Sequence, residues 1–161
     1  MKFFFDTEFL ETSGQGNYNL QIISIGIVAE DGRELYLENA GFDWGQKMDS
    51  WLLENIKPHL LGEGHDSWVS LAEMAQKILE LVGQEPEFWA YAAASDWLAL
   101  ISLFGRVVDR PEGWPIFCRE LKWFLMERGY SKEDMPVQEG QEHLAIADAR
   151  WNLAAYQSLQ A

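Results

Sequence analysis

Three short apolar segments in the first 38 residues constrain the fold most. Residues 2–9, 20–29 and 33–38 are rich in aromatic or β-branched side chains, and the tight-turn pair Asp31-Gly32 separates the last two. Segments of this kind are typical of β-strands, and an Asp-Gly pair favours a hairpin. The first third of the chain is therefore predicted to form three antiparallel strands.

The rest of the chain alternates between helical and extended patterns. Apolar residues between positions 71 and 82 have the spacing of an amphipathic helix, with a capping box from Ser70 and Glu73 and a stop at Gly83. The other predicted elements are helices over 48–57, 96–105 (with Ser95 as N-cap), 120–128 and 144–159, strands over 87–93 and 114–117, and a loop over 131–142. This order indicates an α/β fold, a mixed sheet flanked by helices.

The composition indicates one folded domain over residues 1–161. The chain is 48% hydrophobic and 161 residues long, which suits a single core. The apolar start is too short for a secretion signal, and no stretch is long enough to span a bilayer, so we expect a cytoplasmic protein with no membrane contact. The single cysteine, Cys118, cannot form an internal disulfide and is expected to be a small core residue.

The charge balance restricts the partners that the chain can bind. Twelve basic and 26 acidic residues give a net charge of −14, without a cluster of lysine or arginine. Proteins that hold long nucleic acids usually have a basic face. If this chain acts on nucleic acid, we expect it to hold a few nucleotides at one end of a strand.

Two acidic residues end the first apolar segment. Asp6 and Glu8 are two residues apart on a predicted strand, so their side chains share a face, about 7 Å apart, and Thr7 points the other way. A strand that becomes polar as it reaches solvent would look similar. The apolar run before Asp6 favours a site instead, because it places both acids at the rim of a buried strand.

A third acid, Asp96, follows the apolar run 88–93 and lies at a predicted helix start. An aspartate in a first helical turn is often only a partner of the helix dipole. Asp96 gains weight as a functional residue because it is the third acid in an ordered set.

The last segment contains His143 and Asp148. Five residues correspond to about 140° more than one turn of a helix, so the two side chains converge only if His143 lies in the loop and turns back. Asp148 lies on a mostly apolar helix side, where an aspartate is costly to bury unless it is paired or bound to a cation. We therefore expect Asp148 to feel the repulsion among the acids most. For His143 a surface-loop role is the alternative.

These five positions resemble, in order and spacing, the DEDDh family of 3′–5′ exonucleases, whose fold is ribonuclease-H-like. The segments Asp6-Thr7-Glu8-Phe9, 22–34, Arg119-Glu120-Leu121 and Asp148-Ala149-Arg150 resemble the small single-domain 3′–5′ exoribonucleases typified by a mycobacterial member. The resemblance covers most of the chain.

The resemblance implies a phosphodiester hydrolase with two Mg²⁺ or Mn²⁺ ions. Asp6, Glu8, Asp96 and Asp148 would hold the ions, whose charge of +4 offsets the four carboxylates, and His143 would accept a proton from the attacking water. The implied substrates are short single-stranded RNA or DNA 3′ ends. Candidate substrate-binding residues are Phe9 and Trp97, which would stack on bases, and Arg119, which would contact a phosphate. For each of these three the alternative is a core side chain or a surface ion pair.

Two other functions remain open from the sequence. One is an acidic interaction protein without catalytic activity, such as a DNA mimic, in which the acids need not converge and Mg²⁺ would hardly change stability. The other is a fold relative that binds nucleotides without cleaving them. Eight tryptophans leave room for an aromatic self-interface, so a homodimer is also a prediction.

Overall fold

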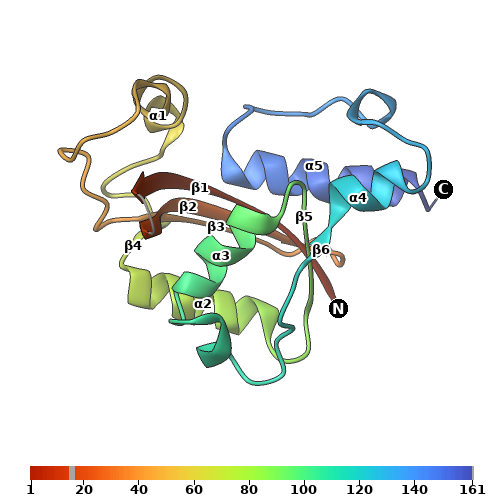
Figure 1. The fold of residues 1–161 in the computed structure, drawn as a ribbon, viewed down its shortest axis with the longest axis horizontal. Helices are drawn as coiled ribbons and strands as arrows, with labels where there is room; N and C mark the ends of the chain where they lie inside the picture. Colours follow the sequence, from red (N-terminus) through yellow and green to blue (C-terminus); the bar gives the residue numbers. More distant parts are fainter. Residues whose placement is uncertain (15–16, 161) are drawn as a thin grey trace.

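Helices cover both faces of a six-stranded sheet in the computed structural model, which describes residues 1–14 and 17–160 (Figure 1). The strands lie in the order β4-β3-β2-β1-β5-β6. Helices α4 and α5 cover one face, and α2 and α3 cover the other. The predicted α/β architecture with a mixed sheet is confirmed.

The three antiparallel strands predicted from the first third of the chain are present. They are β1 (Lys2–Gly14), β2 (Asn17–Ala29) and β3 (Glu34–Asn39). The parallel strands are β4 (Trp68–Val69), which pairs with β3, β5 (Glu87–Ala90), which pairs with β1, and β6 (Arg119–Glu120), which pairs with β5. Strands β1 and β2 extend beyond their apolar parts, because backbone pairing continues through polar residues toward the hairpin end.

The strand predicted over 114–117 is wrong. The Trp114 ring packs 4.9 Å from the Phe88 ring, whereas Phe117 is 79% exposed, and the short strand β6 begins only at Arg119. The apolar residues in this segment therefore reflect a buried tryptophan and an exposed aromatic side chain, and they do not belong to a strand.

The helices are α1 (Ser50–Asn55), α2 (Leu71–Val82), α3 (Ala94–Ser102), α4 (Leu121–Met126) and α5 (Ala145–Ser158). Short 3₁₀ turns cover Lys57–His59, Val107–Asp109 and Lys132–Asp134. The capping box of α2 and its stop at Gly83 are confirmed. None of the helices in the described ranges has both the length and the apolar character needed to cross a membrane.

The predicted N-cap of α3 is wrong, because Ser95 lies inside the helix and the N-cap residue is Ala93. The capping role predicted for Ser95 is taken by a side chain from another element. The Glu120 carboxylate accepts hydrogen bonds from the backbone N–H groups of Ala92 and Ala93, each at 2.8 Å. This contact fixes the start of α3, where Asp96 lies, to strand β6.

Alternate residues of β1 face the two helical layers. Phe3 and Phe5 pack in the cluster under α2 and α3, whereas Phe4 packs in the cluster under α4 and α5. Since side chains alternate along a strand, Asp6 and Glu8 continue the face that α5 covers. The sheet therefore presents its two acids to the N-terminal end of α5.

Gly26 of β2 lets α5 approach the sheet at this point. A Cβ atom on Gly26 would lie 2.4 Å from backbone atoms of Ala145, at the start of α5. Further along α5, the buried Asn152 side chain donates a 3.0 Å hydrogen bond to the Phe5 carbonyl, directly before Asp6. These two contacts set the height of α5 above β1 and therefore the position of Asp148.

Candidate active site

All five motif residues line one cleft, with a volume of about 470 Å³. Its lining residues come from β1, α1, the start of α3, the loop before α5 and α5 itself, elements whose arrangement Figure 1 shows. The complete lining comprises Asp6, Thr7, Glu8, Phe9, Trp51, Leu52, Tyr91, Ala92, Asp96, Lys132, Gln138, His143, Asp148, Trp151 and Asn152. The cleft thus combines four carboxylates with aromatic walls.

The surroundings of Asp6 and Glu8 disfavour the ionised forms of both carboxyl groups. Burial, and then the charges of Asp96, Glu8 and Asp148, raise the pKa of Asp6 well above its ordinary value. Burial, Asp148 and Asp96 raise the pKa of Glu8 to about 9. Desolvation and like charges both disfavour the ionised carboxylates, so Glu8 retains a proton at neutral pH when no metal is bound.

Asp96 is oriented by a residue to which the sequence analysis gave no role. Thr7 donates to the Asp96 Oδ1 atom from its backbone N–H at 3.0 Å and from its hydroxyl at 2.7 Å. Burial raises the pKa of Asp96 to about 6, and the bonds from Thr7 limit the rise. The period-two alternation of β1 was the available signal, because it points Thr7 toward α3, away from Asp6 and Glu8.

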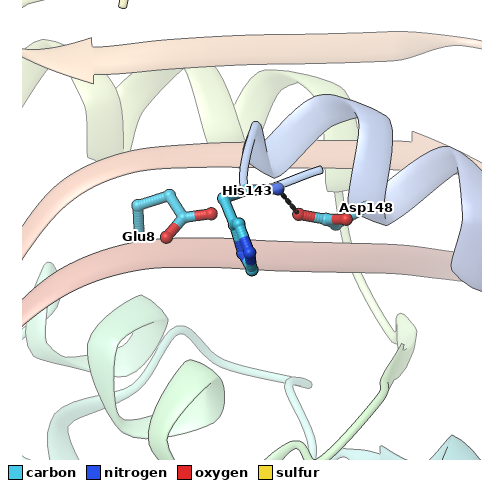
Figure 2. Close-up of side chains that lie close together, drawn as sticks. All are labelled: Glu8, His143 and Asp148. Atoms are coloured by element: carbon cyan, nitrogen blue, oxygen red, sulfur yellow. Dashed lines mark hydrogen bonds between the residues drawn. The ribbon is translucent and has the colours of Figure 1, made fainter. Parts of the chain in front are cut away.

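His143 lies in the loop directly before α5 and turns back over the cleft, as the five-residue spacing requires. Its backbone has a φ of +64°, and its N–H donates a 3.1 Å hydrogen bond to the Asp148 Oδ2 atom (Figure 2). The imidazole ring lies between Glu8 and Asp148 in this view. Its ring packs against that of Trp51 in a T-shaped arrangement, with centroids 4.9 Å apart.

The Asp148 carboxylate has more hydrogen-bond donors around it than expected. The Gln138 side chain donates to one carboxylate oxygen and the His143 N–H to the other. Burial still raises the pKa of Asp148, but these donors counteract the shift, so Asp6 and Glu8 experience the larger effect. The expectation that Asp148 suffers most is wrong, because Gln138 comes from the irregular segment 131–142, whose path could not be predicted from periodicity.

Two of the three predicted substrate-binding residues lie away from the cleft. Trp97 is 6% exposed and packs against Phe5 and Phe88 in the core, so it cannot stack on a base. The side chain of Arg119 is 66% exposed and lies 4.0 Å from a Glu87 carboxylate oxygen, a surface ion pair. Phe9 does line the cleft.

The donor set fits divalent cations of the Mg²⁺ type. Such ions prefer oxygen ligands, and the cleft offers four carboxylates whose pKa values are raised, in each case first by burial. Ligand atoms of Glu8, His143 and Asp148 lie within 4.8 Å of one another. Beside Glu8 on the neighbouring strand, the buried Ser24 hydroxyl has no hydrogen-bond partner in the described part of the chain.

Comparison with known proteins gives a consistent result. Residues 1–160 match the model of the Rv2179c-like 3′-5′ exoribonuclease domain. Two Mycobacterium tuberculosis proteins, 3′-5′ exoribonuclease Rv2179c (strain H37Rv) and 3′-5′ exoribonuclease MT2234.1 (strain CDC 1551), are each 34% identical over 160 residues, 97% of this chain and 91% of theirs.

Solved structures of exonuclease I share the fold. The zinc-bound Escherichia coli exonuclease I–ssDNA complex aligns with a TM-score of 0.67 at 15% identity over 99% of this chain. Apo exonuclease I aligns with a TM-score of 0.64, also at 15% identity. The chain spans about two fifths of those proteins, 40% and 41%. At this identity the likeness supports the ribonuclease-H-like fold alone.

Proposed function

Because the chain belongs to the Rv2179c-like 3′-5′ exoribonuclease domain family, and is therefore a 3′–5′ exonuclease, we propose that it removes nucleotides from the 3′ ends of short single strands in the cleft described above. The observation that carries this proposal is the convergence of Asp6, Glu8, Asp96, His143 and Asp148 on one cavity from three separate segments. Asp6, Glu8, Asp96 and Asp148 are proposed to hold two Mg²⁺ or Mn²⁺ ions.

The bound ions would lower the pKa of an attacking water and stabilise negative charge on the phosphate and the leaving oxygen. The protein holds the metal-binding carboxylates and the His143 ring in position. Thr7 holds Asp96, the loop before α5 holds Asp148, and Trp51 supports the His143 ring. His143 is exposed at the cleft and is proposed to accept the proton from the water, a role that histidine fills more often than any other side chain.

RNA is the proposed substrate because the two mycobacterial relatives are named exoribonucleases, although exonuclease I binds single-stranded DNA in its complexes. The net charge of −14 argues for short strands held near the 3′ end. A cytoplasmic location is proposed as well, because a chain with one cysteine, Cys118, has no internal disulfide that would need an oxidising compartment. Exposed aromatic side chains such as Trp123, which is 63% exposed, leave the homodimer as a proposal.

The DNA-mimic alternative is less well supported. A mimic needs acids spread over its surface, whereas these four carboxylates are drawn into one cavity at a cost that burial imposes on each. A bound cation offsets that cost, so metal should change the stability of a nuclease and hardly change that of a mimic.

End-labelled RNA and DNA oligomers of matched sequence test the proposed function. With Mn²⁺, we expect stepwise loss of mononucleotides from the 3′ end, and chelator or a blocked 3′ end should stop it. RNA should be degraded faster than DNA. Steady cutting of a circular single strand would contradict the exonuclease activity, and identical rates with and without chelator would contradict the metal requirement.

A further inference from the structure

A second pocket adjoins the catalytic cleft and shares two of its residues. It has a volume of about 300 Å³ and lies beside α4, and both Tyr91 and Lys132 line it as well as the cleft. Lys122 and Tyr130 contribute to the second pocket alone. A strand that leaves the cleft past Tyr91 therefore enters this pocket directly.

Two lysines lie over the aromatic wall between the two pockets. The Lys132 ammonium lies 5.4 Å from the centroid of the Trp151 ring, and the Lys122 ammonium lies 5.9 Å from that of Tyr91. The two rings meet edge to face, with centroids 5.3 Å apart. Cation–π contacts at these distances hold each ammonium near a ring face and leave its N–H groups available to an anion.

These two charges differ from the arginines that line other cavities. Within the described ranges, Lys132 is the only lysine or arginine that lines the catalytic cleft, and neither Lys122 nor Lys132 has a carboxylate within ion-pair distance. By contrast, Arg106 and Arg150, which line two other pockets, form ion pairs with Asp109 and Glu34. Glu133 also lines the second pocket, so the ammonium groups there outnumber carboxylates two to one.

Resting on the proposed function, we propose that the second pocket binds the part of the single strand on the 5′ side of the scissile bond, with Lys122 and Lys132 contacting its phosphates. The chain has a net charge of −14, so general attraction cannot hold a polyanion. The two ammonium groups next to the cleft supply a local contact. This arrangement contacts only a few phosphates, so the enzyme holds only a short part of its substrate strand.

Binding of a 5′-fluorescein-labelled RNA pentanucleotide with phosphorothioate linkages, followed by fluorescence anisotropy, tests this site independently of turnover. Lys122→Met and Lys132→Met remove one charge each and retain an apolar side chain over the ring. We expect Kd to rise about tenfold in each variant, which corresponds to removal of one charge-assisted hydrogen bond. The slope of log Kd against log salt should become shallower by about 0.7 for each phosphate that is no longer neutralised.

Lys77→Met is the matched control, because Lys77 is exposed on α2 beside a different pocket and its removal changes the net charge equally. It should bind as the parent does. The proposed site would be overturned if both pocket variants gave the same Kd and the same salt slope as Lys77→Met. Cleavage of thymidine 5′-p-nitrophenyl phosphate, which has no strand on the 5′ side, should be affected less than cleavage of the pentanucleotide with ordinary linkages. If the parent protein binds RNA but never cleaves it, the proposed function is contradicted. The comparison of Kd values still tests the second pocket in that case.

Discussion

At the residue scale, Glu8 should make the metal-free protein less stable as the pH rises. Its pKa is about 9 in the fold and about 4.3 in an unfolded chain, so folding takes up a proton between these values. The folded state binds more protons than the unfolded state, and stability present below pH 4 is lost as the pH rises toward 9. Asp6 shifts in the same direction. In chelator, Tm should therefore fall between pH 5 and pH 9.

Glu8→Gln isolates this effect, because glutamine keeps the shape and cannot ionise. At pH 8 in chelator the variant should melt at least about 5 °C above the parent, since one pKa unit equals about 1.4 kcal/mol and each kcal/mol shifts Tm by about 2–4 °C in a chain of this size. Glu54→Gln, on the exposed side of α1, is the control and should follow the parent. A parent whose Tm rises from pH 5 to pH 9 in chelator would refute the prediction.

His143→Ala distinguishes a proton acceptor from a metal ligand. If His143 is the general base, activity should fall by about 10²–10⁴-fold, and the increase in Tm that Mn²⁺ produces should persist. Its closeness to Glu8 and Asp148 makes the second measurement necessary, because a ligand would reduce the increase. Asp148→Asn should lose both activity and most of the Mn²⁺ effect. His65→Ala, where Nδ1 is within 2.9 Å of the Ser67 hydroxyl far from the cleft, should leave both unchanged.

The five motif positions could be predicted because their order and spacing resemble the DEDDh family, and because strand and helix geometry allows them to converge. Their partners could not. Thr7 bonds to Asp96 across 89 residues, and Gln138 reaches Asp148 from a segment without periodicity. Trp97 was misplaced for a related reason, since a tryptophan beside a catalytic acid looks the same in sequence whether it faces the cleft or the core.

At the element scale, Gly26 should control the position of α5. In Gly26→Ala the new methyl group meets the Ala145 backbone at 2.4 Å, so the start of α5 must move away from β2. Overpacking of this kind costs about 1–3 kcal/mol, a decrease in Tm of about 2–12 °C. Activity at a temperature where the variant is fully folded should fall further, because Asp148 and His143 move with the helix.

Gly41→Ala is the matched control, because its nearest contact is the Asn39 side chain at 3.4 Å. Melting curves and rates for the two variants separate a local steric effect from a general effect of replacing glycine. Equal Tm values and equal rates for both would show that the close approach of α5 to β2 is not needed for the site.

Elements with a local signal were predicted well. The Asp31-Gly32 hairpin and the capped helix α2 depend on residues next to one another in the chain. The start of α3 and strand β6 depend on each other through Glu120, which accepts from two N–H groups almost thirty residues away. A cap of this kind has no local sequence pattern. The prediction therefore chose Ser95, a nearby residue of a type that often caps helices.

At the scale of the whole molecule, metal binding should release protons. The metal-free protein at pH 7.5 retains a proton on Glu8, whose pKa is about 9, and the pKa of Asp6 is raised as well, while a cation must bind the ionised carboxylates. Mn²⁺ therefore replaces protons as the positive charge in the cleft. Metal affinity should rise with pH, and the same cation should raise Tm most where the metal-free protein is least stable.

Calorimetric titration with Mn²⁺ at pH 7.5 in two buffers of different ionisation enthalpy measures this release. The difference in apparent enthalpy should correspond to about one proton or more per protein, because a carboxyl group with a pKa near 9 is almost fully protonated at that pH. In Glu8→Gln the release should fall by about one proton, the share that Glu8 contributes. An apparent enthalpy that is the same in both buffers for the parent would mean that the acids are already ionised without metal, and the proposed exchange of protons for cations would be wrong.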